Sequence, residues 1–312
     1  MERAKRTDTR PTPSPLHHTF CYVLAGCMLL AVAGTSWAGQ ALRKKAQSHQ
    51  PDPLEALQRD TRYVKDGNIM MGRDLERIAD AHETQAIPFL EQIFTKLRTQ
   101  TIGIDAILSR IPPPSYQNDG GYEASELNLQ NELHIANVLI RLGVRDDTYW
   151  HYLASQAKAS LQINMPFNVA ADALGDHNPP PNPAFLAWTK SHNMDKSVAA
   201  MYQLFVQPSP VAFLAMTRDP RGIPLLRQAL TSTNPMIQAW ASKSLAAQHD
   251  NASIPLIITA CKKLPSSGRT ALAESLLYFN DPQAQQYALL NLPKDIYLSV
   301  RQQIAQGHTP FN

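Results

Sequence analysis

The sequence has only three cysteines, and two of them, Cys21 and Cys27, lie in an apolar run near the start of the chain. Cys261 is the one cysteine of the rest, which excludes an intrachain disulfide and a thiolate metal cage there. Glycine is also scarce, with 13 residues among 312, whereas proline is frequent, with 24. This composition favours short helices separated by proline-containing connections over a sheet protein.

Basic charge is lacking outside the first 45 residues. The chain has 29 basic and 26 acidic residues, and residues 1–45 hold seven of the basic and two of the acidic ones. The remainder therefore carries 22 bases and 24 acids, a net charge of −2. Because nucleic-acid binding needs a clustered basic surface that neutralises phosphates, we expect no nucleic-acid partner.

Catalytic and cofactor motifs are missing as well. The sequence contains no Gly-x-Ser-x-Gly, Gly-x-x-x-x-Gly-Lys, Gly-x-Gly-x-x-Gly, His-Glu-x-x-His or Cys-x-x-Cys-His. Its ten histidines are scattered, apart from His17 and His18. We therefore expect no catalytic residue, no cofactor and no metal ligand.

An uncharged, mostly apolar segment at residues 19–39 follows a basic tail at residues 1–18. The 19 residues from Phe20 to Ala38 are enough to cross a bilayer core as a helix. Small residues at Ser36 and Ala38 also fit a cleavage site. The segment predicts either a single-pass membrane anchor or a signal peptide.

The charges beside this segment bear on its orientation. Four basic residues precede the segment and three follow it, so the positive-inside rule hardly distinguishes the two orientations. We expect the body of the chain outside the cytoplasm, with a cytoplasmic body as the alternative. The letters LAGC ending at Cys27 also resemble a bacterial lipobox, but the apolar run before them is short. In the alternative, purely structural interpretation, Cys21 and Cys27 are small apolar residues of a membrane helix.

One phrase occurs three times: AIPFLEQIF from Ala86, GIPLLRQAL from Gly222 and SIPLIITAC from Ser253. Apolar residues with i, i+3, i+7 spacing share one face of a helix. The proline after each isoleucine falls in the first turn, where a missing N–H costs little. Each phrase therefore predicts the start of a short amphipathic helix, with these trios on its buried face: Ile87, Leu90, Phe94; Ile223, Leu226, Leu230; and Ile254, Ile257, Cys261.

A second helix follows within a unit of 31 residues. Leu214, Leu245 and Leu276 recur at this interval, and an aspartate closes each unit at Asp219, Asp250 and Asp281. A helix pair of this size cannot bury its own apolar face, so neighbouring pairs must stack on one another. The sequence predicts an all-α fold, an α-solenoid of stacked helix pairs.

The repeated residues resemble the short bacterial HEAT-like repeats described in phycobilisome lyases. The shared pattern is Asp-x-x-x-Ile-Pro-x-Leu followed by a second helix, over residues 209–290 and partly over residues 74–97. In that family an arginine often stands early in the second helix; here Gln238 replaces it in one unit and Arg269 retains it in the next. The resemblance implies that second helices line the binding side, with Gln238, Ser242 and Arg269 as exposed partner-binding residues.

The chain divides by composition into five parts. Between residues 98 and 206 the repeat keeps no period, and GDHNPPPNP belongs to a long proline-rich insertion at residues 162–184. From Asp281 the stripe weakens, as expected for a polar terminal repeat. The predicted parts are a basic tail (1–18), an anchor or signal peptide (19–39), a linker (40–60), a helical region with one degenerate unit and the insertion (61–206), and HEAT-like repeats with a C-terminal cap (207–312).

Three further features can be interpreted either as structural or as functional. Trp150 in YWHY shares a stripe with Leu153 and Ala157, so we expect it in the core rather than on an aromatic binding platform. Cys261 occupies the position of Phe94 and Leu230, which predicts a buried, inert thiol. Asp172, Asp176 and His177 are expected in a solvated turn rather than a catalytic cluster.

These observations favour a non-enzymatic, membrane-anchored or exported scaffold that binds a protein partner in the cell envelope. One alternative is a HEAT-like enzyme of the phycobilin-lyase or DNA-glycosylase type. Another is a small-ligand or glycan carrier that uses the proline-rich insertion.

Overall fold

The structure is a computed structural model, and it describes residues 52–62, 72–99, 120–167, 182–192, 194, 196–264 and 266–311. The predicted anchor or signal segment at residues 19–39 and the cluster of Asp172, Asp176 and His177 lie outside these residues. Within the described residues, no helix has the length and apolar character needed to cross a membrane.

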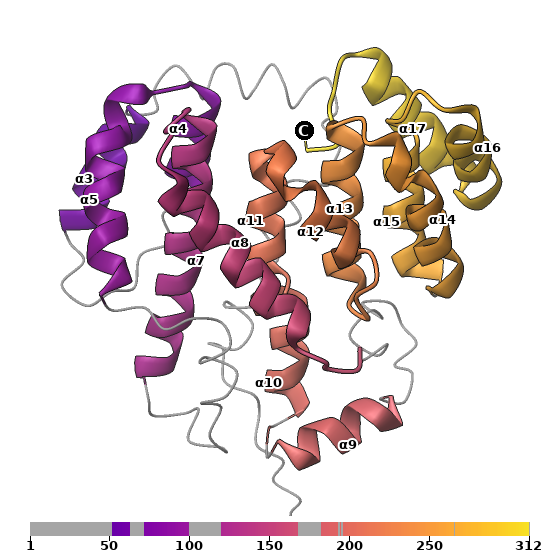
Figure 1. Ribbon diagram of the computed structural model, residues 1–312, viewed down its shortest axis with the longest axis horizontal. Helices are drawn as coiled ribbons and strands as arrows, with labels where there is room; N and C mark the ends of the chain where they lie inside the picture. Colours follow the sequence, from indigo (N-terminus) through magenta and orange to yellow (C-terminus); the bar gives the residue numbers. More distant parts are fainter. Residues whose placement is uncertain are drawn as a thin grey trace, which may run out of the picture. The chain divides into compact units, whose positions relative to one another are not determined.

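The described part of the chain contains helices and no strand, which confirms the predicted all-α class (Figure 1). The α-helices are α3 (Pro53–Arg62), α4 (Gly72–Asp80), α5 (Ile87–Arg98), α7 (Gly120–Arg141), α8 (Asp147–Gln162), α9 (Pro183–Ser191), α10 (Lys196–Met201), α11 (Ser209–Thr217), α12 (Ile223–Ala229), α13 (Pro235–Ala247), α14 (Ile254–Lys263), α15 (Ser266–Leu276), α16 (Pro282–Asn291) and α17 (Lys294–Ala305). Short 3₁₀ turns are η1 (Thr84–Ala86), η4 (Pro220–Gly222) and η5 (Asn251–Ser253), and η3 (Tyr202–Val206) is a π-helix.

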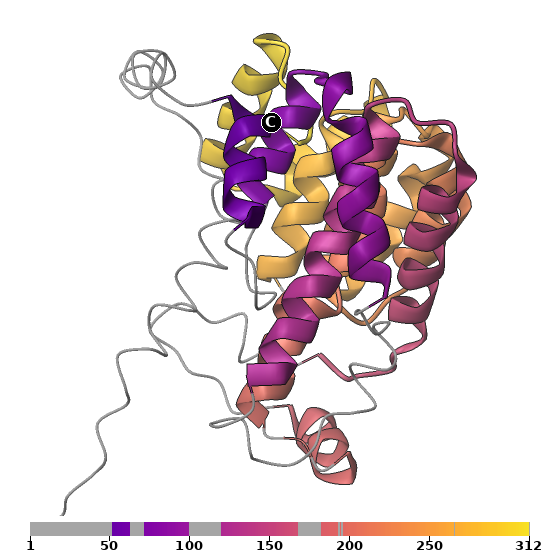
Figure 2. The same cartoon turned by 90° about the vertical axis from the view of Figure 1, so that its left-hand side faces the viewer.

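The helices pack in pairs along the chain. The contacting pairs are α3 with α4, α5 with α7, α8 with α11, α12 with α13, α14 with α15, and α16 with α17. The second helices of these pairs also contact one another in order, from α4 through α7, α11, α13 and α15 to α17. Figure 2 shows one of these pairs, α5 against α7, from the side. Helices α9 and α10 interrupt the α8–α11 pair in sequence.

The Ile-Pro phrases begin helices as predicted. Pro88, Pro224 and Pro255 are the second residues of α5, α12 and α14, where a backbone N–H has no intrahelical acceptor to lose. A 3₁₀ turn precedes each of these helices. The repeated Ile-Pro motif therefore specifies one local structure, a tight turn that leads into a helix.

The predicted apolar stripes form the core. The buried members in the first helices are Leu90, Phe94, Leu226, Leu230, Ile254, Ile257 and Cys261, while Ile87 and Ile223 are half-buried. In the second helices Leu214, Leu245 and Leu276 are all buried. Gly268 lets α15 approach α13 closely, because a Cβ there would lie 3.3 Å from Cβ of Pro235.

Five of the six described second helices, all but α15, end near a residue with a positive φ. One or two residues after the end of α4, α7, α11, α13 and α17, the backbone has a positive φ. These residues are His82, Gly143, Arg218, His249 and Gly307. After α4, α7, α13 and α17 the next N–H bonds back five residues, as in Glu83 to Ile78 and Asp250 to Leu245. This is the Schellman arrangement, which satisfies the last carbonyls of a helix and reverses the chain.

Burial separates the two sets of helices. Neither α11 nor α13 contains an exposed residue, and the described side chains of α15 do not either. Helices α12, α14 and α16, by contrast, carry exposed residues along one side. The second helices α11, α13 and α15 therefore form the more enclosed layer.

Two features differ from the expected organisation. Helix α3 begins at Pro53, inside the range 40–60 predicted as a linker, because Asp52 accepts the N–H of Leu54 and starts a helix there. The last pair is also less polar than a capping repeat should be. Leu289, Leu290 and Leu298 are 56%, 74% and 55% exposed.

Candidate interaction face on the second helices

The predicted exposure of Gln238 and Ser242 is wrong. Both side chains are buried in α13. Gln238 donates from Nε2 to the carbonyls of Leu230 at 3.1 Å and Ser232 at 2.6 Å, and Ser242 donates to the carbonyl of Ala239 at 3.0 Å. Their polar atoms complete backbone hydrogen bonds inside the protein, so these two residues offer no surface to a partner.

Arg269, the third predicted partner-binding residue, is half-buried in α15. Its Nη2 donates to the carbonyl of Leu264 at 3.1 Å, in the connection between α14 and α15. The arginine that the resemblance placed on a binding side therefore holds the two helices of one pair together.

The opposite flank of the same helices carries the accessible side chains. Trp240 and Lys243 in α13 are half-buried, with the Lys243 Nζ 5.6 Å from the centre of the Trp240 ring. Glu274 in α15 and Tyr278, two residues after the end of α15, are half-buried too. Burial lowers the pKa of Lys243 and raises that of Glu274, and each charge partly offsets the effect on the other. The two form a coupled pair of charges between neighbouring second helices.

Further along the row, α4 and α7 contribute a charged cluster. Arg141 donates to Glu76 and to Asp80, at 2.8 Å each, and His134 contacts Glu76 at 2.5 Å. Burial alone would raise the pKa of Glu76, but hydrogen bonds and charges from His134 and Arg141 lower it to about 2. Glu76 is therefore ionised over the whole physiological pH range.

Arg218 connects this cluster to Trp240. It follows α11 and has a φ of 54°, and its pKa is lowered by burial and by the charge of Arg141, against the charge of Asp80. Its guanidinium lies 5.1 Å from the ring centre of Phe311, and the Phe311 ring stacks on Trp240 with centres 6.3 Å apart and planes 16° apart. Side chains of α4, α7, α13 and α15, together with Arg218 directly after α11, thus lie along the row of second helices, and we call them the second-helix face.

The two residues predicted to be exposed on α13 lie instead on a buried flank of this helix. On α13, Ile237, Ala241 and Leu245 form the central core stripe, with Gln238 and Ser242 on one flank and Trp240 and Lys243 on the other. Polarity favoured the first flank as the exposed one. The one sequence signal for the second flank was the pairing of an aromatic residue with a base three residues later.

Trp150 is not a core residue, contrary to the prediction. Tyr149, Tyr152 and Leu153 are the buried residues of this part of α8, and Trp150 is half-buried. The Arg221 guanidinium lies 4.8 Å from the Trp150 ring centre, so the indole carries a cation–π contact at the surface.

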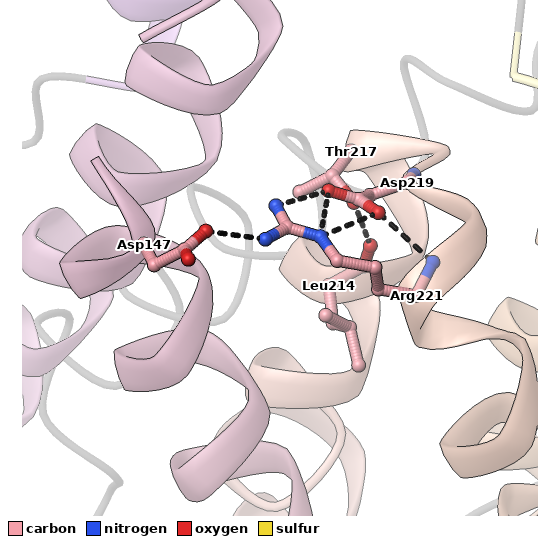
Figure 3. A network of polar contacts seen from close by, with 5 residues as sticks. All are labelled: Asp147, Leu214, Thr217, Asp219 and Arg221. Atoms are coloured by element: carbon pink, nitrogen blue, oxygen red, sulfur yellow. Dashed lines mark hydrogen bonds and ion pairs between the residues drawn. The ribbon is translucent and has the colours of Figure 1, made fainter. Parts of the chain in front are cut away.

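Arg221 also bridges two neighbouring helix pairs, as Figure 3 shows. Its guanidinium donates to Asp147 at the start of α8, at 2.5 Å, and to Asp219 before η4, at 2.6 Å. Thr217 accepts the N–H of Asp219 at 3.1 Å and orients it. One unit later, Arg227 of α12 repeats this role on Asp250 before η5, at 2.5 Å.

The other predicted sites stand as follows. Cys261 is fully buried, and burial raises the pKa of its thiol to about 12, in agreement with an inert core cysteine. Among the described residues, no group of three or more histidine, cysteine, aspartate or glutamate side chains could hold a metal ion.

A groove of about 480 Å³ lies between α5 and α8, away from the second-helix face. It is lined by Phe94, Arg98, Thr148, His151, Tyr152 and Ser155.

No known protein family, curated protein or solved structure matches this chain. The candidate face therefore stands on its own geometry.

Proposed function

We propose that this chain is a non-enzymatic scaffold, an α-solenoid of HEAT-like helix pairs that binds a protein partner on its second-helix face. One observation carries the proposal: charged side chains of α4, α7, α13 and α15, the aromatic Trp240 of α13 and Arg218 after α11 lie along consecutive second helices. Faces of this composition suit protein recognition, because aromatic residues and arginine contribute most to binding free energy.

The solenoid rests on the ordered packing of the helix pairs. Each second helix contacts the next, and five of these helices are followed within two residues by a residue in the left-handed conformation. Stacking of this kind supports an extended binding surface, because every pair presents the same side to solvent. The proposed concave side is the enclosed layer formed by the second helices.

Anchorage in the cell envelope is part of the proposal and rests on the sequence of residues 19–39 alone. The phycobilin-lyase alternative has less support, because Cys261 is buried and its thiol has a pKa raised to about 12. A thiol in that state is a poor nucleophile at neutral pH.

Photocrosslinking in the cells that make this protein tests the scaffold. A photoreactive amino acid at Tyr278, just after α15 on the second-helix face, should give a discrete crosslinked protein. The same amino acid at Lys262, an exposed position of α14, is the matched control. Equal crosslinking at both positions, or a crosslinked protein at Lys262 alone, would contradict a binding site on the second helices.

A further inference from the structure

The segment that follows α17 lies on the second-helix face. Gly307 has a φ of 81°, which reverses the chain after α17, and the N–H of His308 bonds to the carbonyl of Gln303 at 3.0 Å. Figure 1 shows this end of the chain beside α13. Residues 308–311 therefore return to the helices that form the candidate interaction face.

Phe311 fills a position between two recognition groups. Its ring stacks on Trp240 of α13, with centres 6.3 Å apart, and lies 5.1 Å from the Arg218 guanidinium after α11. Arg218 also donates from Nη2 to Oγ1 of Thr309 at 3.3 Å. Two different helices thus hold one short, non-helical segment by an aromatic ring and a hydroxyl.

Such contacts are those by which proteins hold peptides from other chains. An aromatic ring placed between an indole and a guanidinium gains both stacking and cation–π attraction. The Thr309 hydroxyl also accepts the N–H of Phe311 at 3.4 Å, so the backbone turns just before the ring. The Arg218 side chain is exposed, so its guanidinium is accessible to the aromatic ring of an incoming segment.

We propose that Arg218 and Trp240 form a binding site for an aromatic side chain carried on an extended segment of a partner protein, and that residues 308–311 of this chain occupy the site until that partner displaces them. The proposal rests on the proposed function and names the chemistry its partner needs. That chemistry is an aromatic residue with a hydrogen-bond acceptor two positions earlier, as in Thr309-Pro310-Phe311.

Because residues 308–311 occupy the site, a partner segment must compete with them in order to bind. A tethered segment competes at an effective concentration of about a millimolar, so a free peptide of the same sequence meets a site already filled. Removing the Phe311 ring should leave the helices unchanged and open the site.

The test uses a fluorescein-labelled peptide of residues 306–312, QGHTPFN, and measures its fluorescence anisotropy against the full-length chain. We expect the Phe311→Ala chain to bind this peptide about tenfold or more tightly than the unaltered chain does. Gln306→Ala, an exposed change in the same stretch, should bind as the unaltered chain does. A peptide with alanine in place of phenylalanine should not bind either chain.

Two changes in the Phe311→Ala background locate the site. Trp240→Ala should abolish peptide binding, whereas Trp188→Ala, which removes an indole stacked on His192 of its own segment, should preserve it. Because Trp240→Ala could unfold the chain, Arg218→Asn supplies a second variant; asparagine tolerates the left-handed backbone at that position, and we expect it to weaken binding about tenfold.

Equal peptide affinity in the unaltered and Phe311→Ala chains overturns the inference, as does binding of the alanine peptide. Either outcome leaves crosslinking at Tyr278 standing, so the scaffold would survive. Peptide binding that follows the expected pattern, with no crosslinked protein at Tyr278, would overturn the proposed function instead.

Discussion

Gln238 is buried because its side-chain amide serves two backbone carbonyls, those of Leu230 and Ser232. These carbonyls lie just beyond α12, where a helix end leaves acceptors without partners. We expect Gln238→Ala to lower the free energy of unfolding by about 1–3 kcal/mol, because both acceptors would lose their buried donor. Urea denaturation monitored by circular dichroism measures this change.

The control for Gln238 is Gln228→Ala, an exposed glutamine of α12. It should change the free energy of unfolding by less than about 0.5 kcal/mol. Similar small effects at both positions would mean that water replaces the Gln238 amide, and that the residue is not part of the core.

Glu76 gives the fold a defined pH dependence. Its pKa is lowered from 4.5 to about 2, so its charged form stabilises the folded state. That stabilisation is complete above about pH 5 and is lost as the pH falls toward about 2. Because the Glu76 side chain is 33% exposed, solvent screening reduces it to about 1–2 kcal/mol.

Unfolding of Glu76→Gln and the unaltered chain should therefore be compared between about pH 2 and pH 7. The variant should be less stable at neutral pH, and the difference should disappear at the acid end. Glu55→Gln, at an exposed position of α3, is the control. A difference that stays constant across the range would exclude the proposed role of the carboxylate charge.

Among individual residues, the apolar core could be predicted from the sequence, and the polar residues could not. Leu214, Leu245 and Leu276 are buried as the 31-residue spacing indicates. The spacing locates the centre of a helix's buried stripe, but it does not say which polar flank faces a neighbour. That choice depends on the carbonyls within reach, as those after α12 are for Gln238.

At the scale of elements, the left-handed residues after the second helices make a further prediction. His249 has a φ of 52° after α13, which costs an ordinary residue about 1–2 kcal/mol and costs glycine nothing. We expect His249→Gly to stabilise the protein by about 0.5–1 kcal/mol, the remainder being lost to the greater freedom of glycine in the unfolded chain.

Gln248→Gly is the matched change one residue earlier. Gln248 has a φ of −93°, so glycine relieves no strain there and should destabilise the protein. Thermal unfolding of both variants distinguishes the two effects. If both glycines destabilise, the left-handed turn after α13 is not a source of strain.

The helices that follow a repeated phrase were predictable, and those between the phrases were only partly so. Ile-Pro placed the starts of α5, α12 and α14, because proline fixes the first turn. The α8–α11 pair has no such phrase, and α9, α10 and η3 separate its two members in sequence. The packing that joins α8 to α11 depends on tertiary contacts, which leave no short-range pattern.

At the scale of the whole molecule, neighbouring pairs are joined by arginine–aspartate contacts as well as by the core. Arg221 ties the start of α12 to α8, and Arg227 ties α12 to Asp250 before α14. Such partly exposed ion pairs contribute little to stability, because solvent screens them. The apolar layer between successive second helices therefore supplies most of the coupling, and only its regular spacing was visible in the sequence.

The central claim is that the helix pairs form a stack in which each pair depends mainly on its neighbours. Hydrogen exchange followed by mass spectrometry, on the full-length chain and its Leu276→Ala variant, tests this claim most directly. Leu276 is fully buried in α15, so the variant should lose about 2–5 kcal/mol locally. Leu289→Ala, at an exposed position of α16, is the control.

The account predicts faster exchange in α13–α17 of the Leu276→Ala chain, with exchange in α4, α5 and α7 unchanged. Leu289→Ala should leave all of these helices as they are. Exchange that accelerates equally from α4 to α17 in the Leu276→Ala chain would show one indivisible core and contradict the stack of helix pairs.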